Sequence, residues 1–197
     1  MKCKRLAAIP FVSVALVAVN IVVFLACEFA GNTIYAAGRL TAYDVLHKGE
    51  YGRLLWAMFL HGDIGHLFNN MLLVYFLGAM LEQEVGHVRY AVVYFLSGLG
   101  GNILSLWGKI LTGNPAGSIG ASGAVFGLDG LLLALVLFSG RRMENVSMPR
   151  VLVMIAYSLY SGFTGANIDN AAHVGGLITG FLTGIVCCLL MRRRQKL

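Results

Sequence analysis

The sequence predicts an all-α, polytopic membrane protein that folds as one bundle of six spanning helices. Hydrophobic residues make up 58% of the 197 residues and charged residues only 12%, a composition too apolar for a soluble domain. The apolar residues gather in six stretches of helical character, and the basic residues divide unevenly between the loops that join them. We therefore expect residues 1–197 to form a single membrane domain.

Six apolar segments are candidates for membrane spans: residues 11–29, 67–81, 90–107, 121–138, 151–163 and 171–191. A bilayer core about 30 Å thick requires roughly 20 helical residues. The second and fifth segments are shorter, so we expect them to extend into flanking turns or to lie where the membrane is thinned. The first segment could instead be a cleaved signal peptide, but it is longer than the roughly 7 to 15 apolar residues of such peptides, which favours a retained span.

The lysines and arginines indicate how the bundle is oriented, because basic residues in short loops stay in the cytoplasm. With six spans, eleven of the fifteen basic residues fall on one side, and four fall on the other: Arg39, Lys48, Arg53 and Lys109. This division predicts a multi-pass protein of the cell membrane, inner or plasma, with both termini in the cytoplasm. It also accounts for the formal charge of +6 without a nucleic-acid partner, and we expect none.

The connection between the first two segments, residues 30–66, is long for a compact bundle and should have structure of its own. Residues 43–46 and 53–60 are compatible with helix. Tyr51, Trp56 and Phe59 are amphipathic anchors suited to the interface between water and lipid. The loop is either a packed outer cap or a wall that meets substrate.

Polar residues precede the second segment at His61, Asp63 and His66. A spacing of five does not place His61 and His66 on one helical face, so a zinc site is a weak interpretation, and we predict no metal or other cofactor. His66 and Asn70, four residues apart at a helix start, should project side by side. Two such donors could stabilise an oxyanion, although helix capping and interhelical hydrogen bonding explain them equally well.

A serine and a histidine open the fourth and sixth segments. Ser122 lies between Gly120 and Gly123, and His173 is followed at helical spacing by Gly176, Gly180 and Gly184, while Gly127 continues the glycine face of the fourth segment. Small-residue faces let two helices approach closely, which would bring Ser122 to His173 near the outer membrane boundary. A serine hydroxyl needs an adjacent base to become a nucleophile, and histidine titrates near neutral pH. Each residue alone is explained as well by packing; together they predict a reactive pair.

These motifs resemble those of the rhomboid intramembrane serine proteases: His66-x-x-x-Asn70, Gly120-Ala-Ser122-Gly123 and Ala172-His173-x-x-Gly176. The resemblance extends over nearly the whole chain from Glu50 onward. It implies a rhomboid-like bundle in which Ser122 is the nucleophile and His173 the general base of a dyad. It also implies an oxyanion hole formed by His66, Asn70 and the backbone N–H of Ser122, an aromatic ring at Phe126 against the histidine, and a structural carboxylate at Glu82.

The chain departs from the family pattern at Gly52-Arg53, where Trp-Arg is frequent; we expect Arg53 to be structural and the loop to be looser without the indole. Asp129 lies seven residues after Ser122 and about 10 Å deeper. We expect it to pair with a hydroxyl such as that of Thr179 or Thr183, or to stay protonated. Asp169 or Asn170, just before His173, could orient the imidazole ring.

Hydrolysis requires water, so the site should lie in a cavity open to the outer side. We expect His61, His66, Asn70 and Asn170 to line this cavity and residues 112–119 to shape it. Substrate should arrive sideways from lipid past the short fifth segment. There Tyr157, Tyr160 and Phe163 could form a movable gate with residues 162–170.

The predicted function is therefore an intramembrane serine endopeptidase. Its expected partners are membrane lipids and single-span proteins whose outer helix end unwinds readily through Gly, Ala, Ser or Pro. The sequence specifies no oligomeric state. The alternative is a catalytically inactive rhomboid-like protein that binds membrane clients, although such a protein should lack a reacting residue that this chain keeps. A small transporter is disfavoured because the sequence has no internal repeat.

Overall fold

The computed structural model describes residues 9–139, 148–164 and 168–194. Their regular secondary structure is helical apart from one isolated antiparallel bridge, between Leu40 and Ser118. In chain order the helices are α1 (Phe11–Ala30), α2 (Asn32–Gly38), α3 (Ala42–Lys48), α4 (Arg53–Trp56), η1 (Ala57–Phe59), α5 (Ile64–Val85), α6 (His87–Thr112), α7 (Ser122–Phe138), α8 (Met148–Thr164) and α9 (Asn170–Arg194).

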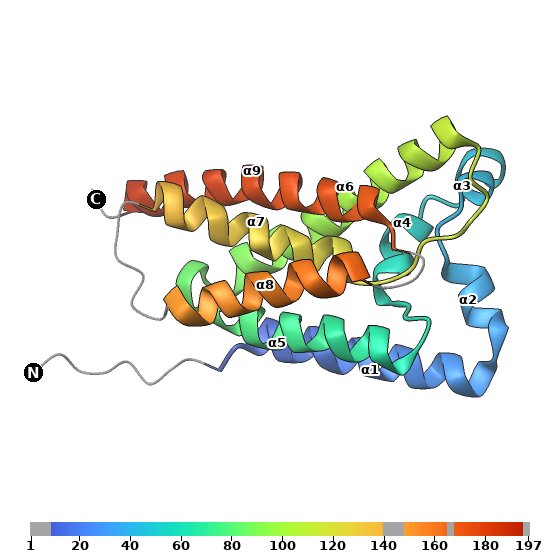
Figure 1. The fold of residues 1–197 in the computed structure, drawn as a ribbon, viewed down its shortest axis with the longest axis horizontal. Coiled ribbons are helices and arrows are strands. Elements are labelled where there is room, and N and C mark those ends of the chain that lie inside the picture. Colours follow the sequence, from blue (N-terminus) through green and yellow to red (C-terminus); the bar gives the residue numbers. More distant parts are fainter. Residues whose placement is uncertain (1–8, 140–147, 165–167, 195–197) are drawn as a thin grey trace, which may run out of the picture.

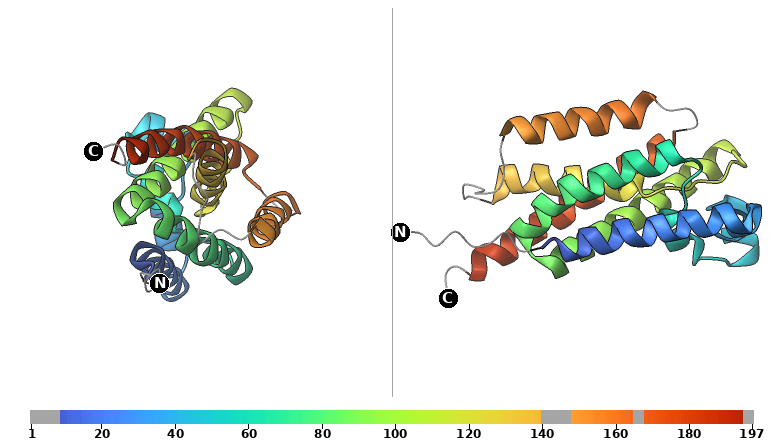
Figure 2. Two further views of the ribbon diagram at one scale, coloured as in Figure 1. Left: turned by 90° about the vertical axis from the view of Figure 1, so that its left-hand side faces the viewer. Right: turned by 90° about the horizontal axis from the view of Figure 1, so that it is seen from below.

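The long helices run roughly along one axis, and the short helices α2, α3 and α4 cover one end of the bundle (Figure 1). Helix α1 begins and helix α9 ends at the opposite end. Seen along the bundle, α7 lies in the interior and α8 stands at the edge (Figure 2). Residues 123–132 of α7 are all buried. The first turn of this central helix, which carries Ser122, points toward the covered end.

Four helices, α1, α5, α6 and α9, are long and apolar enough to cross a membrane, and α7 is a shorter apolar helix of 17 residues. Helix α8 also has 17 residues. The expected class of fold, an all-helical membrane protein, is therefore confirmed. The second apolar segment extends into flanking turns, as expected, because α5 has 22 residues. It starts early since the Asp63 carboxylate caps it by accepting the N–H of His66 at 2.8 Å.

The long outer connection is structured, as expected, and contains α2, α3, α4 and η1. The side chain of Arg53 joins two parts of this connection. It is 7% exposed and donates to the carbonyls of Ala36 and Arg39 at 2.7 and 2.9 Å. A side chain at Gly52 would meet nothing within 4 Å. Tyr51 and Trp56 are exposed as anchors should be, but Phe59 is buried in the core, so its assignment to the interface was wrong.

Glu82 ties α5 to α1 at the other end of the bundle. Its carboxylate is buried and accepts the backbone N–H groups of Val12 and Ser13, each at 2.8 Å, and the Ser13 hydroxyl at 2.7 Å. The first N–H groups of a helix lack partners within the helix. Glu82 therefore satisfies the start of α1, which agrees with the structural role that the sequence predicted.

Helices α7 and α9 touch through backbone. A Cβ atom added to Gly176 would lie 1.9 Å from the carbonyl oxygen of Gly123, and one added to Gly180 would lie 2.0 Å from that of Gly127. Helix α6 joins the contact, because a Cβ at Gly175 would lie 2.8 Å from the Gly100 carbonyl oxygen. No side chain fits in these places, so the sequence requires glycine there for the helices to stay in register.

This contact predicts that Gly180→Ala destabilises the protein far more than Gly108→Ala does. The added methyl group at residue 180 forces α7 and α9 apart, whereas at residue 108 it would meet only the Ala171 Cβ, at an ordinary 3.7 Å. Overpacking of this kind costs about 1–3 kcal/mol. Thermal unfolding of both variants in detergent is the measurement, and equal melting temperatures would contradict the packing described here.

Candidate active site

Ser122 and His173 lie together at the end of the α7–α9 contact where both helices begin. Ser122 is the first residue of α7, and His173 lies in the first turn of α9. The Ser122 Oγ is 2.9 Å from Nε2 of His173. The histidine is 6% exposed and Ser122 is partly exposed. The arrangement provides a hydroxyl within hydrogen-bond reach of an imidazole nitrogen, which is the geometry that nucleophilic activation requires.

Phe126, one turn after Ser122, stacks against one face of the His173 imidazole ring. The two rings stack with centroids 4.2 Å apart and planes 9° apart. Gly162 of α8 packs behind them, because a Cβ there would lie 2.5 Å from the Phe126 ring and 3.5 Å from His173 Nδ1. The imidazole therefore has little rotational freedom, and its Nε2 stays directed at Ser122.

The second imidazole nitrogen has no acidic partner. Among the described residues, Nδ1 of His173 makes no hydrogen bond. The Asp169 carboxylate is engaged elsewhere, and Asn170 is exposed at the start of α9 with no recorded hydrogen bond to the histidine in the described part of the chain. In the described part of the chain, neither Asp169 nor Asn170 orients the imidazole ring through a side-chain hydrogen bond. The arrangement is therefore a pair of residues and not a triad.

Asp169 instead fastens the start of α9. Its carboxylate accepts the N–H of Ala172 at 3.0 Å and the hydroxyls of Ser105 from α6 and Ser118 from the preceding loop, and its carbonyl accepts the N–H of His173. Burial raises the pKa of Asp169, but these hydrogen bonds outweigh it and hold the pKa below its usual range. The carboxylate is therefore ionised at neutral pH and positions the turn that carries His173.

His66 and Gly120 meet beside Ser122. Gly120 has φ +124°, a conformation that side chains rarely adopt, and a Cβ there would lie 2.7 Å from Nε2 of His66. Asn70, one turn further along α5, is buried and donates one amide hydrogen to the His66 carbonyl at 3.0 Å. The predicted donors thus lie on one face at the start of α5, and the His66 ring contacts the loop that leads into Ser122.

His61 does not line a cavity, contrary to expectation. It is fully buried, its ring lies edge-on to that of His66 with centroids 5.0 Å apart, and burial and His66 lower its pKa to about 3. His61 is therefore neutral at physiological pH. Among the described residues no group of three or more His, Cys, Asp or Glu side chains is placed to hold a metal ion.

A pocket of about 320 Å³ does open at this end, lined by Gly117 and Ile119 of the loop before α7 together with Gly62 and three residues of the α2 region. Gly117 and Ile119 of residues 112–119 thus line a pocket, but it is not the cavity that was expected, because His66, Asn70 and Asn170 do not line it. The expectation placed these polar side chains at a surface, whereas Asn70 is turned to a helix carbonyl and His66 lies against Gly120.

Asp129 pairs with α8, not with α9. Its carboxylate accepts the Ser158 hydroxyl at 2.6 Å. The predicted partners Thr179 and Thr183 donate to carbonyls of their own helix instead.

A second polar link joins α8 to α5, where the Tyr157 hydroxyl donates to Asn69 at 2.6 Å. Of the other residues expected in a gate, Tyr160 is exposed, while the Phe163 side chain and residues 165–167 lie outside the described residues.

The role of Asp169 as a helix cap predicts that Asp169→Ala destabilises the protein by about 1–2 kcal/mol at neutral pH. Because the folded-state pKa is lowered, the contribution is complete above the ordinary aspartate pKa and is lost as the pH falls through the folded value. The difference in melting temperature between wild type and variant should therefore shrink below about pH 4. Asn170→Ala is the matched control and should change little; equal effects of the two substitutions at pH 7 would contradict the capping role.

Comparison with known proteins identifies the family. A match to the Rhomboid domain covers residues 48–190. RHOMBOID-like protein 1 of Arabidopsis thaliana is 40% identical over 157 residues, which are 78% of this chain and 39% of that protein. Rhomboid protease GluP of Bacillus subtilis (strain 168) is 34% identical over 170 residues, 84% of this chain and 32% of that protein. The chain thus spans about two fifths or less of the length of these two relatives.

Putative rhomboid protease YdcA of Bacillus subtilis (strain 168) is closer in length: it is 33% identical over 158 residues, which are 79% of this chain and 77% of that protein. The Ser122 and His173 arrangement and the glycine contact both lie within the part of the chain that matches the Rhomboid domain. This chain belongs to the rhomboid family.

Proposed function

We propose that this protein is an intramembrane serine endopeptidase that uses Ser122 and His173 as a catalytic dyad. The observation that supports it is the 2.9 Å contact between the Ser122 hydroxyl and His173 Nε2, with the imidazole stacked on Phe126. Membership of the rhomboid family and similarity to a protein named as a rhomboid protease point in the same direction.

In the proposed reaction, His173 Nε2 takes the Ser122 proton as Oγ attacks the carbonyl carbon of the substrate peptide bond. The oxyanion that forms accepts hydrogen bonds from the Ser122 backbone N–H and from His66 and Asn70. His173 then gives the proton to the leaving amine, and the acyl group stays on Ser122. Water, activated by the same histidine, hydrolyses this ester and restores the serine.

The proposed topology has six spans, with α7 and α8 crossing in addition to the four longer helices, both termini in the cytoplasm and the site near the outer surface of the cell membrane. The distribution of lysine and arginine supports this orientation. The beginning of α1 and the end of α9 lie at one end of the bundle, away from the short outer helices (Figure 1). Substrates would be single-span proteins whose outer helix end unwinds, which exposes a peptide bond to the dyad.

The dyad predicts that Ser122→Ala and His173→Ala each lower the cleavage rate of a fluorogenic single-span substrate in liposomes by at least about 10³-fold. Thr112→Ala is the matched control, because its exposed hydroxyl only donates to the Gly108 carbonyl of its own helix. Cleavage that persists in both dyad variants would mean that the activity is not this protein's own. A well-folded wild type that binds the substrate without cleaving it would favour the inactive, client-binding alternative.

Substrate would reach the dyad by displacement of α8, the helix at the edge of the bundle (Figure 2). Tyr157→Phe removes the hydrogen bond from α8 to Asn69 and keeps the ring. A hydrogen bond contributes about 0.5–1.5 kcal/mol, so the variant should cleave substrate roughly 2–10 times faster if opening limits the rate. Tyr75→Phe, on the exposed side of α5, is the control. A Tyr157→Phe rate equal to or below that of wild type would contradict a gate at α8.

A further inference from the structure

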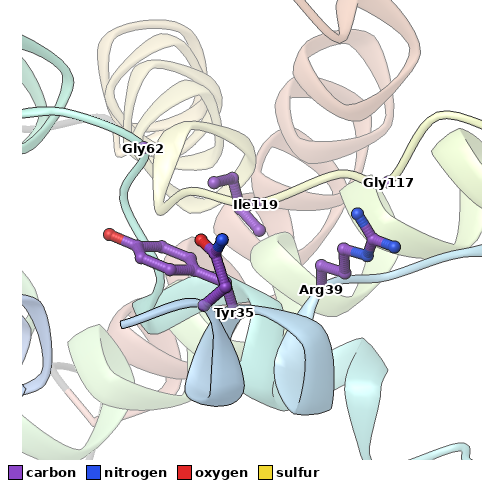
Figure 3. A pocket seen from close by; sticks show the side chains of 6 residues that line it. Tyr35, Arg39, Gly62, Gly117 and Ile119 are labelled. Carbon is purple, nitrogen blue, oxygen red and sulfur yellow. The ribbon is translucent and has the colours of Figure 1, made fainter. Parts of the chain in front are cut away.

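The pocket at the outer end of the bundle has no part in the proposed reaction, yet residues of the two segments that lead into the proposed site line it. Figure 3 shows Tyr35 of α2 and Arg39, the residue that follows α2, facing Gly62, Gly117 and Ile119 across an open space. Ile119 lies three residues before Ser122, and Gly62 lies four residues before His66. The walls of the pocket are therefore continuous in sequence with the two segments that carry the proposed nucleophile and oxyanion donors.

Two contacts shape the basic wall of the pocket. A Cβ added to Gly117 would lie 3.0 Å from Cδ and 3.3 Å from Cγ of Arg39, so the absence of a side chain lets the arginine stem lie across this loop. Tyr35 is fixed because its hydroxyl donates to the His61 carbonyl. The guanidinium of Arg39 is thereby presented at the pocket by packing of its own stem.

Arg39 is distinguished by its lack of a charge partner. Of the four basic residues predicted for the outer side, the other three form ion pairs: Lys48 with Asp44, Arg53 with Glu50 and Lys109 with Asp169. Within the described part of the chain Arg39 forms none, and its side chain is exposed. Two carboxylates, those of Glu28 and Asp63, act electrostatically on Tyr35, and Asp63 is engaged as the cap of α5. The pocket therefore offers guanidinium donors that a carboxylate would satisfy in bidentate fashion.

The length of chain between the pocket and Ser122 limits how far from the cleaved bond such a carboxylate would lie. The loop before α7 is held in place, because Ser118 pairs with Leu40 through two backbone hydrogen bonds of 2.9 Å and the Gly120 N–H donates to the Ala57 carbonyl at 2.8 Å. Three residues from Ile119 to Ser122 span at most about 10 Å. An extended substrate covers the same distance with about three residues.

We infer that this pocket is a specificity subsite in which Arg39 binds an acidic side chain of the substrate, within about four residues of the cleaved peptide bond. The inference rests on the proposed function and adds to it the class of substrate side chain that the site selects. Asn32, which also lines the pocket, supplies a side-chain amide that can donate to the same carboxylate. A lysine at that substrate position would face an unpaired guanidinium and be rejected.

The test is a set of single-span substrates that carry glutamate, glutamine or lysine in turn at each of the four positions on either side of the cleaved bond. Cleavage in phosphatidylcholine liposomes gives kcat/KM for wild type, Arg39→Glu and the control Arg192→Met, which changes an exposed arginine at the far end of α9. At one position, wild type and the control should prefer glutamate over lysine by about fivefold or more. Arg39→Glu should reverse the preference, so that the lysine substrate is restored by the opposite charge.

The outcomes separate this inference from the proposed function. If cleavage depends on Ser122 but the charge preference is the same in wild type and Arg39→Glu, the subsite is wrong. The proposed protease activity is then still supported. Cleavage that does not depend on Ser122 overturns both. If Arg39→Glu changes the rate only when phosphatidylglycerol is added, whatever the substrate charge, the guanidinium binds lipid phosphate and the subsite is wrong.

Discussion

The close backbone contact between α7 and α9 is the constraint on which the rest of this structure depends. Between helices in lipid there is little hydrophobic driving force, and association relies on packing and hydrogen bonds. Gly176 and Gly180 let α9 lie against the carbonyls of Gly123 and Gly127, with no room for a methyl group between them. The register set by these glycines places the first turn of α9 beside the first turn of α7, and so brings His173 within 2.9 Å of Ser122.

The other polar groups maintain this register or surround it. Asp169 links α6, the loop before α7 and the start of α9 at a single carboxylate. Glu82 does the same for α1 and α5 at the opposite end. Helix α8 is different, because polar links at Tyr157 and Ser158 join it to α5 and α7, and it stands at the edge of the bundle (Figure 2). Side-chain hydrogen bonds therefore join α8 to the bundle, whereas close backbone contact joins α9 to α7.

The sequence predicted the parts of the site that depend on spacing within a helix. Glycines at i+3 and i+7 from His173 identified the contact face, and the resemblance to the rhomboid proteases indicated that Phe126 lies against the imidazole ring. It did not predict features that depend on distant segments. The His61 ring is buried beside that of His66, and Asp129 pairs with Ser158 of α8. The hydroxyl partners of Asp169 are Ser105 and Ser118, which lie 64 and 51 residues away in sequence.

Labelling with a fluorophosphonate, a reagent that reacts with activated serine hydroxyls, tests most directly whether His173 activates Ser122. The protein in liposomes would be treated with the reagent and the modified peptide identified by mass spectrometry, in wild type and in His173→Ala. The account predicts one adduct, on Ser122, whose formation is lost with the histidine. Labelling of Ser122 at the same rate without His173, or no labelling of Ser122 in the folded wild type, would contradict it.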